Sequence, residues 1–271
     1  MNAAPRPLQG RRALVTGSVQ GIGLAIAEAL AAQGAALVLH GLAGAQELEG
    51  ARAALRQAGA SQVDAFTHDL RQPDQVEALV HAALAGGAVD ILVNNAGIQH
   101  TAPLAQMPRS RWDEILAVNL SAAFDTMRLL LPRMAQAGYG RVVNIASVHG
   151  LVASVQKAPY VAAKFGLVGM SRVAALEYAG AGSRASGGVT VNCVCPGWTE
   201  TAIIEPQIQA RAAALATGRE EALRDLMREK QPSQRTSLPS EIARVVTWLC
   251  EPAAHNLTGA AIPVDGGWTA Q

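Results

Sequence analysis

Short apolar runs, many of them rich in β-branched residues, alternate along the chain with longer alanine-rich stretches. Seven of these runs have the length and composition of strands, and they lie at residues 13–15, 36–40, 63–67, 91–94, 142–145, 189–194 and 261–264. Because the runs are almost continuously apolar, we expect both faces of the strands to be covered. Helical spacers favour parallel pairing through right-handed crossovers. The pattern therefore predicts an α/β fold, with one doubly wound, Rossmann-type, seven-stranded parallel sheet and helices on both faces.

The chain shows no sign of division into separate domains. Its 271 residues can bury a large core without a disulfide or a metal. We find no internal repeat and no long low-complexity tract, so we expect a single domain over residues 1–271. The glycine- and serine-rich stretch 180–188 is the best candidate for a loop.

Charge and composition favour a small-molecule partner. The net charge is +1 and 16% of residues are charged, without long basic runs, so the footprint expected for nucleic acid or an anionic membrane is missing. The N-terminal segment has no apolar stretch typical of a signal peptide. No later segment offers the roughly 18 uninterrupted apolar residues of a membrane span. We therefore expect a cytoplasmic protein.

The three cysteines do not suggest a metal site. Cys193 and Cys195 alternate along an expected strand, Cys250 lies far from them, and no second Cys or His pair stands at ligand spacing. We expect small buried thiols in a reducing compartment and no bound metal.

A candidate proton-transfer group is formed by Tyr160 and Lys164, with Ser147 upstream of them. On a helix, residues four apart share one face, so an ammonium at Lys164 would favour the ionised phenol of Tyr160. An unperturbed phenol has a pKa of about 10, so a base that works near neutrality needs a depression of about three units. A lone Tyr-x-x-x-Lys also occurs on ordinary helix surfaces, so the rest of the chain must support this interpretation.

A glycine-rich turn follows the first expected strand. Gly17, Gly21, Ile22 and Gly23 form the pattern Gly-x-x-x-Gly-x-Gly and open a helix over 24–32. Glycines at these positions let the backbone and the helix N-terminus approach a pyrophosphate. Although a tight strand-to-helix turn would have the same composition, the place after strand one favours a dinucleotide site.

Two further segments lie where an open α/β sheet binds its ligands, at the carboxyl ends of strands. Asp69 and Leu70 follow the third strand, and the segment 94–97, which contains Asn95 and Gly97, follows the fourth. Asp69 could accept a hydrogen bond from an adenine amino group or cap the helix that starts near Pro73. The sequence leaves both roles open.

The end of the second strand, 40–42, is where an acid would select NAD and an Arg would select NADP. The sequence has neither there, and no Arg or Lys stands at 40–44 or 18–20. Since nothing in these segments would neutralise a 2′-phosphate, we expect NAD.

Together these segments resemble the short-chain dehydrogenase/reductase family. The resemblance rests on the glycine turn, the motif 94–97, Asn119, Ser147, the Tyr160 and Lys164 pair, and Pro196-Gly197 followed by Thr201, in the family order over nearly the whole chain. It implies a nicotinamide-dependent oxidoreductase on a single doubly wound domain.

Segments that vary within the family resemble one of its groups, the bacterial D-3-hydroxybutyrate dehydrogenases. These segments are 94–103, 147–154, Lys157, Pro196-Gly197-Trp198 and 265–270. The resemblance implies reversible, NAD-dependent oxidation of D-3-hydroxybutyrate to acetoacetate, and it assigns substrate-binding roles to Gln99, His149, Lys157, Gln207, Trp198 and Trp268. A small β-hydroxy acid needs one cation, neutral donors and an apolar wall, which this set supplies. Taken singly, each polar residue could equally be an ordinary solvated loop side chain.

The resemblance also assigns the remaining roles. Ser147 would hold the substrate hydroxyl, Tyr160 would act as the base, Lys164 would bind the nicotinamide ribose, and Asn119 would position a relaying water. Pro196, Gly197, Thr199 and Thr201 would contact the cofactor, residues 199–219 would form a mobile substrate lid, and the protein would be a homotetramer. Two departures are the long 180–188 loop and Pro206, just before Gln207.

Two other functions are compatible with parts of this pattern. One is an NADPH-dependent 3-oxoacyl or other ketone reductase, which would share Ser147, Tyr160 and Lys164 but would prefer basic residues near Ser18 or Gly41. The other is a non-catalytic nucleotide sensor on the same fold, which usually lacks one of the catalytic residues. The complete set present here argues against the sensor.

Overall fold

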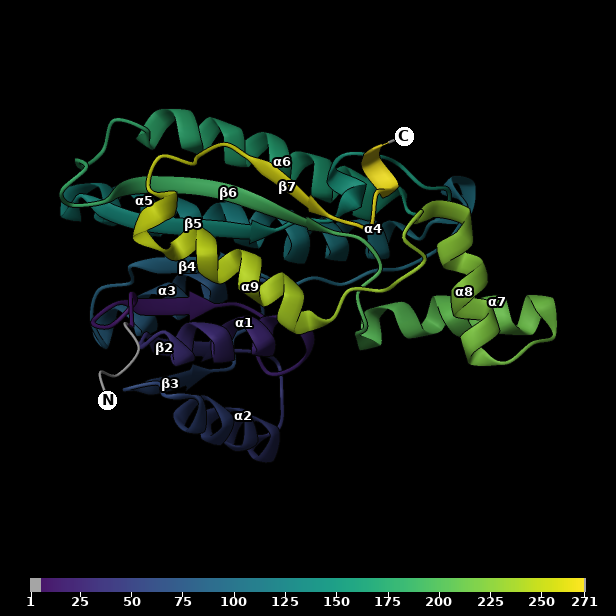
Figure 1. The fold of residues 1–271 in the computed structure, drawn as a ribbon, viewed down its shortest axis with the longest axis horizontal. Helices are drawn as coiled ribbons and strands as arrows, with labels where there is room; N and C mark the ends of the chain where they lie inside the picture. The colour runs from purple at the N-terminus through teal and green to yellow at the C-terminus, as the bar shows by residue number, and fades with distance from the viewer. Residues whose placement is uncertain (1–5, 271) are drawn as a thin grey trace.

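The structure is a computed structural model that describes residues 6–270. Its centre is one parallel sheet of seven strands in the order β3-β2-β1-β4-β5-β6-β7 (Figure 1). The strands are β1 (Arg12–Val15), β2 (Ala36–His40), β3 (Val63–Phe66), β4 (Ile91–Asn94), β5 (Tyr139–Ile145), β6 (Gly188–Pro196) and β7 (Ala261–Val264). The predicted α/β fold is therefore confirmed. Residues 1–5 of the segment that shows no signal-peptide pattern lie outside the described residues.

Helices cover both faces of this sheet. On one face lie α1 (Gly21–Ala32), α2 (Ala45–Ala58) and α9 (Pro239–Cys250). On the other lie α3 (Pro73–Ala85), α5 (Ala122–Ala137) and α6 (Ala158–Tyr178), with α4 (Arg109–Leu116) packed against α6. Successive side chains of a strand point to opposite faces, so Ala13 and Val15 join the first core and Leu14 joins the second. This explains why the strands are apolar almost throughout.

Two helices project beyond the carboxyl ends of the strands. They are α7 (Glu205–Leu215) and α8 (Arg219–Lys230), which pack on each other and stand clear of the sheet in Figure 1. They belong to the connection between β6 and α9, of which residues 199–219, with α7, were predicted as a lid, whereas α8 lies almost wholly outside that prediction. Their position places them over the edge of the sheet where ligands bind in open α/β folds.

The middle strands extend further than predicted. β5 begins at Tyr139 rather than at residue 142, and it pairs there with Gly188, the first residue of β6. The buried Arg141 donates hydrogen bonds to the carbonyl oxygens of Gly187 and Gly188 at 3.1 and 2.9 Å. These bonds fix the end of the predicted 180–188 loop to the sheet, which sequence patterning alone did not reveal.

One continuous helical stretch of the described residues, Arg109–Ala137, is long and apolar enough to span a membrane by length and composition. Its α5 part buries Met127, Leu130 and Leu131 in the second core. It also packs against α3 and β5. Such contacts are typical of a core helix in a globular fold, which accounts for the apolar composition of α5.

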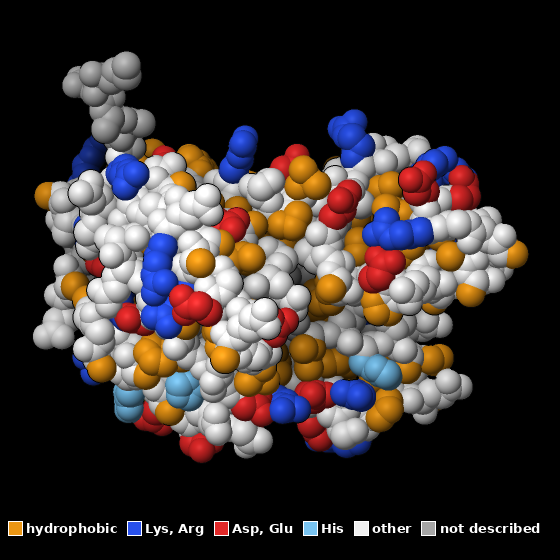
Figure 2. Space-filling model, turned by 90° about the horizontal axis from the view of Figure 1, so that it is seen from below, with side chains coloured by type: hydrophobic (Ala, Val, Ile, Leu, Met, Phe, Trp, Pro, Cys, Tyr) orange, Lys and Arg blue, Asp and Glu red, His pale blue; other side chains and the backbone are white. Residues whose placement is uncertain are grey.

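Charged side chains show no segregation by sign on the face drawn in Figure 2, where Lys and Arg alternate with Asp and Glu. The distribution agrees with the small net charge of +1. It provides no basic stripe on that face for a polyanion.

Candidate active site

A cavity of about 480 Å³ opens at the carboxyl ends of the strands. The strand order places β1 beside β4, although their outgoing connections lead in opposite directions, and such a switch point is where open sheets form a ligand crevice. Every predicted substrate and cofactor residue lines this cavity: Gly17, Gly21, Ile22, Gly23, Asp69, Leu70, Asn95, Gly97, Gln99, His149, Lys157, Pro196, Gly197, Trp198, Thr199, Thr201, Gln207 and Trp268. Ser147, Tyr160 and Lys164 line it too.

The glycine turn is too crowded for side chains. Gly17 has a φ of +62°, and a Cβ there would lie 2.9 Å from the Cα of Ala96. A Cβ on Gly23 would lie 2.1 Å from the carbonyl oxygen of Gly17. Glycine is therefore required at both positions, which lets the turn after β1 pack directly on the segment after β4.

Asn95 and Thr16 join these two segments through hydrogen bonds. The Asn95 amide donates to the carbonyl oxygens of Thr16 and Gly17, at 2.9 Å each. In return the Thr16 hydroxyl accepts from the backbone N–H groups of Asn95 and Ala96, at 3.0 and 3.1 Å. The Asn95 side chain thus shapes the turn.

The N-terminus of α1 is suited to an anion. Its N-cap residue Gln20 makes no side-chain capping bond, so no capping side chain occupies the free N–H groups of the first turn. With the glycines, these donors form a cradle that fits the pyrophosphate of a dinucleotide.

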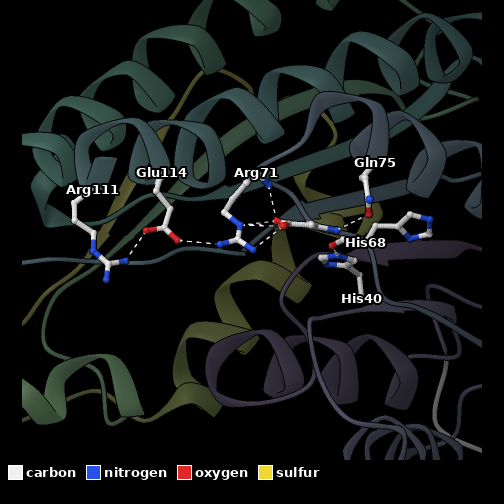
Figure 3. Close-up of polar contacts among 7 residues, drawn as sticks. His40, His68, Arg71, Gln75, Arg111 and Glu114 are labelled. Carbon is white, nitrogen blue, oxygen red and sulfur yellow. Dashed lines mark hydrogen bonds and ion pairs between the residues drawn. The ribbon is translucent and has the colours of Figure 1, made fainter. Parts of the chain in front are cut away.

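His40 links the glycine turn to the segment after β3. Its Nδ1 accepts a hydrogen bond from the Gly17 N–H at 3.3 Å, and its Nε2 lies 2.9 Å from the carbonyl oxygen of His68. These two partners require a neutral ring with the proton on Nε2, and burial lowers the pKa of His40, which favours the same form. Figure 3 shows His40 reaching the His68 backbone.

Asp69 is engaged by Arg71, two residues further on. The Arg71 guanidinium holds both carboxylate oxygens, at 2.7 to 3.0 Å, and lowers the pKa of Asp69. The alternative in which Asp69 caps α3 is wrong, because the N-cap of that helix is Gln72. Arg71 also reaches Glu114 of α4 at 3.3 Å, and both residues line the cavity (Figure 3).

Arg71 is a residue that the sequence analysis missed. The expectation of NAD rests on the lack of a cation at 18–20 and 40–44, whereas Arg71 brings a guanidinium to the wall of the same cavity from the β3–α3 connection. Its charge is already balanced by Asp69 and Glu114. The sequence signal that could have identified Arg71 is its position two residues after Asp69, in the connection that follows β3.

Ser147, His149 and Tyr160 meet at the centre of the cavity. Ser147 and His149 lie in the turn after β5, with Ser147 Oγ 3.3 Å from His149 Nδ1. Tyr160 lies in the first turn of α6, and its ring meets the His149 ring edge-on with the centroids 5.9 Å apart. Two parts of the fold, the end of β5 and the start of α6, thus bring together a hydroxyl, a phenol and an imidazole.

Lys164 lies on the same helix face as Tyr160, as predicted, but its ammonium points elsewhere. The Nζ atom donates a 2.7 Å hydrogen bond to the carbonyl oxygen of Ile145 and lies 5.6 Å from the Tyr160 ring centroid. Burial lowers the pKa of Lys164 to about 8.

The expected depression of the phenol pKa is wrong for the protein without a cofactor. Burial raises the pKa of Tyr160, and a hydrogen bond with Ser147 offsets this only in part. Proximity along the helix predicted the neighbour correctly. It could not show that burial would raise the pKa of the phenol.

Asn119 lies beside the main cavity and not in its wall. It occupies a π-helical turn, Ala117–Ser121, between α4 and α5. Its side-chain amide exchanges two hydrogen bonds with the backbone of Ile98, at 2.9 Å each. With Lys164, Asn119 lines a second, much smaller cavity. These two bonds hold the Asn119 side chain against the backbone of Ile98.

The far end of the cavity holds a cation and an amide. The buried Lys157 donates a hydrogen bond to Gln207 Oε1 of α7 at 2.8 Å. Burial lowers the pKa of Lys157 to about 8, with a smaller contribution from Lys230. Gln99 lines the same cavity and makes no side-chain hydrogen bond within the described residues. These donors converge from three separate segments.

Two tryptophans form an apolar wall at this end. The rings of Trp198 and Trp268 stack at 19° with centroids 6.4 Å apart, and His149 meets Trp268 edge-on at 5.5 Å. The pKa of His149 is lowered to about 3, mainly by burial and to a smaller extent by the positive charges of Lys157 and Lys230. His149 is therefore a neutral imidazole whose Nε2 has no partner among the described residues. Lys230, 5.6 Å from the Trp268 centroid, was not predicted.

Comparisons with known proteins agree with this geometry. The family model described as short chain dehydrogenase matches residues 11–212. A D-beta-hydroxybutyrate dehydrogenase of Cupriavidus necator is 46% identical over 266 residues, covering 97% of this chain and 100% of that protein. A D-beta-hydroxybutyrate dehydrogenase of Rhizobium meliloti is 38% identical over 262 residues, covering 96% and 99%.

A similar solved structure is that of a variant of actinorhodin polyketide ketoreductase with NADPH. It is 36% identical, has a TM-score of 0.87, and the match covers 96% of this chain and 98% of that one. The fold, the cavity and the matched sequence lead to one assignment: the chain belongs to the short-chain dehydrogenase family of oxidoreductases.

Proposed function

We propose that the protein catalyses the reversible, NAD-dependent oxidation of D-3-hydroxybutyrate to acetoacetate. The observation that carries this proposal is the buried Lys157, which donates to Gln207 in the cavity that also contains Ser147 and Tyr160. A buried ammonium with no acidic partner among the described residues suits a small substrate that carries its own carboxylate. The two similar dehydrogenases named above support the same reaction.

The substrate carboxylate is proposed to bind Lys157, with Gln207, Gln99 and His149 as neutral hydrogen-bonding groups. Its arrival would supply the anion that Lys157 lacks and a partner for the free Nε2 of His149, which donates when the ring proton is on that nitrogen. Trp198 and Trp268 would contact the short apolar chain.

Proton transfer is assigned to Ser147 and Tyr160. Ser147 would hold the 3-hydroxyl, and Tyr160, as phenolate, would remove its proton. The nicotinamide ring of bound NAD supplies the hydride acceptor for C3. Lys164 would stabilise the phenolate and bind the nicotinamide ribose, and Asn119 would position a water that carries the proton outward.

The cofactor is proposed to bind across the switch point of the sheet. The pyrophosphate would lie on the turn formed by Gly17, Gly21, Ile22 and Gly23, where the backbone is bare of side chains at three of the four positions. The remaining proposed cofactor contacts line the same cavity: Asp69, Leu70, Asn95, Gly97, Tyr160, Lys164, Pro196, Gly197, Thr199 and Thr201. NAD is preferred because 18–20 and 40–44 lack a cation and because Arg71 is already paired with two carboxylates.

Residues 199–219 are proposed to act as a lid. Within them, α7 carries Gln207, and this residue joins Lys157 across the cavity. Closing the segment over the carboxylate would exclude water from the reacting atoms. If hydrogen exchange in 199–219 were identical with and without NAD and substrate, the lid role would be wrong.

An NADPH-dependent ketone reductase is the second candidate. Arg71 in the cavity wall and the similar ketoreductase structure with NADPH favour it. The two candidates differ in the need for a carboxylate. Wild-type protein should oxidise D-3-hydroxybutyrate and fail with its methyl ester, whereas a preference for the ester or for a 3-hydroxyacyl thioester with NADP would support the reductase.

A further inference from the structure

Lys230 lies close to the substrate end of the cavity without lining it. It is the last residue of α8, and its Nζ donates a 3.0 Å hydrogen bond to Ser154 Oγ, in the segment between β5 and α6. The same ammonium lies 5.6 Å from the ring centroid of Trp268. Lys230 therefore contacts both the aromatic wall and the segment that leads to Lys157.

The charge of Lys230 is poorly balanced. Its nearest carboxylate oxygen belongs to Glu229, at 3.8 Å, and the Glu229 side chain is 50% exposed. Asp265, after β7, is buried but directs both oxygens to the residues that follow it, Gly267 and Thr269. Neither acid cancels the positive charge near Trp268.

The other titratable groups that face this end are Lys157 and His149. The positive charge of Lys230 contributes to the lowered pKa of each, after the larger effect of burial. With His149 neutral, this end of the cavity has the ammonium group of Lys157 in its wall and that of Lys230 close behind it, and no free carboxylate among the described residues that line it.

We propose that Lys230 is a positioning residue for the substrate carboxylate: it supplies a second positive charge and fixes Trp268 and the Ser154 segment against the substrate end. This inference rests on the proposed function, because it assumes an anionic substrate. It assigns to α8 a part in anion selection through Lys230, which lies behind the cavity wall at Trp268 and Ser154.

The test compares Lys230→Gln and Lys230→Arg with wild-type protein. Lys230→Gln should raise the KM for D-3-hydroxybutyrate roughly tenfold with kcat changed less than about twofold, since the lost attraction acts mainly on binding. Lys230→Arg, which keeps the positive charge, should have a KM close to that of the wild-type protein. Arg228→Gln is the matched control, since Arg228 is 60% exposed on the same helix and carries the same charge away from the cavity.

A binding measurement separates this inference from the proposed reaction. Butyrate has no 3-hydroxyl and cannot be oxidised, and butyramide is its uncharged counterpart. In the presence of NAD, quenching of tryptophan fluorescence should show weaker butyrate binding in Lys230→Gln, with butyramide unaffected. Equal losses for both ligands would mean that Lys230 only packs the wall, and unchanged butyrate affinity would overturn the proposal. Lack of NADH formation from D-3-hydroxybutyrate would instead refute the reaction.

The pH profile offers a second readout. Without the Lys230 charge, the pKa of Lys157 should rise, so the alkaline fall in kcat/KM should move to higher pH in Lys230→Gln. Arg228→Gln should leave that fall in place. A profile that is identical in all variants would contradict the electrostatic part of the proposal.

Discussion

Lys157 Nζ donates a 2.8 Å hydrogen bond to Gln207 Oε1 and so joins the residue that precedes α6 to α7 across the cavity. Replacing Lys157 by Met should remove the only buried cation at the substrate end of the described cavity wall. Charge-assisted hydrogen bonds contribute about 1.5–3 kcal/mol, so KM for D-3-hydroxybutyrate should rise roughly 10- to 100-fold.

Gln207→Ala should have a smaller effect of the same kind, because it removes a neutral group, whereas Gln209→Ala on the same helix should have none. Steady-state kinetics with saturating NAD measure all three variants. A Lys157→Met enzyme with an unchanged KM would contradict the carboxylate site.

The pH dependence of oxidation should be bell-shaped. Tyr160 must be ionised, and burial raises its pKa, so activity should increase with pH. Lys157 has its pKa lowered to about 8, so it is charged below that pH and neutral above it. Substrate affinity should therefore decline as pH rises through about 8. The pH profile of kcat/KM measures both the rise assigned to Tyr160 and the fall assigned to Lys157. A rate independent of pH would contradict both assignments.

Tyr160→Phe should abolish turnover while leaving cofactor binding nearly intact. The ring remains to pack against His149, and only the phenol oxygen is lost. We expect kcat to fall by at least about 100-fold, the lower range for loss of a general base. NADH fluorescence titration and steady-state rates measure the two properties. Tyr178→Phe, at the far end of α6, is the control, and substantial activity in Tyr160→Phe would remove the proposed base.

Asp69 should recognise the adenine amino group even though Arg71 occupies much of its carboxylate. Asp69→Ala should weaken NAD binding roughly fivefold, the effect of one hydrogen bond of about 1 kcal/mol. Nicotinamide hypoxanthine dinucleotide lacks that amino group, so it should bind wild-type protein and Asp69→Ala about equally. If Asp69→Ala still preferred NAD over this analogue, the adenine contact would lie elsewhere.

Oligomerisation should involve α6. Phe165, Val173 and Leu176 lie on one face of this helix and are 45%, 54% and 80% exposed, with the open position Gly169 between them. This apolar stripe supports the homotetramer that the family resemblance implies. Phe165→Glu should reduce the mass measured by light scattering, whereas Val155→Glu, at an exposed loop position, should not. A monomeric wild-type protein would contradict the expectation.

The scaffold was predictable from the sequence because its strands are buried on both faces. The run Leu37 to Leu39 shows this as consecutive, fully buried apolar residues, and the turn at Gly17 and Gly23 shows close backbone packing as glycine. Burial on both faces and close backbone packing each restrict which residue types can occupy a position, so both can be recognised in the sequence.

Side-chain partners over long sequence distances were harder to predict. Lys230 meets Trp268 and Ser154 only because α8 folds back over the sheet edge, and Arg71 turns back onto Asp69 while reaching α4. The pKa of Tyr160 depends on burial by several elements, so the position of Lys164 one turn away could not give its direction.

The most direct test of the proposed reaction is NADH formation by the wild-type protein with D-3-hydroxybutyrate and NAD, compared with L-3-hydroxybutyrate and with NADP. We predict rapid turnover with the D-enantiomer and NAD, and little with either alternative. Turnover only with NADP, or only with a 3-hydroxyacyl thioester, would contradict the proposed reaction.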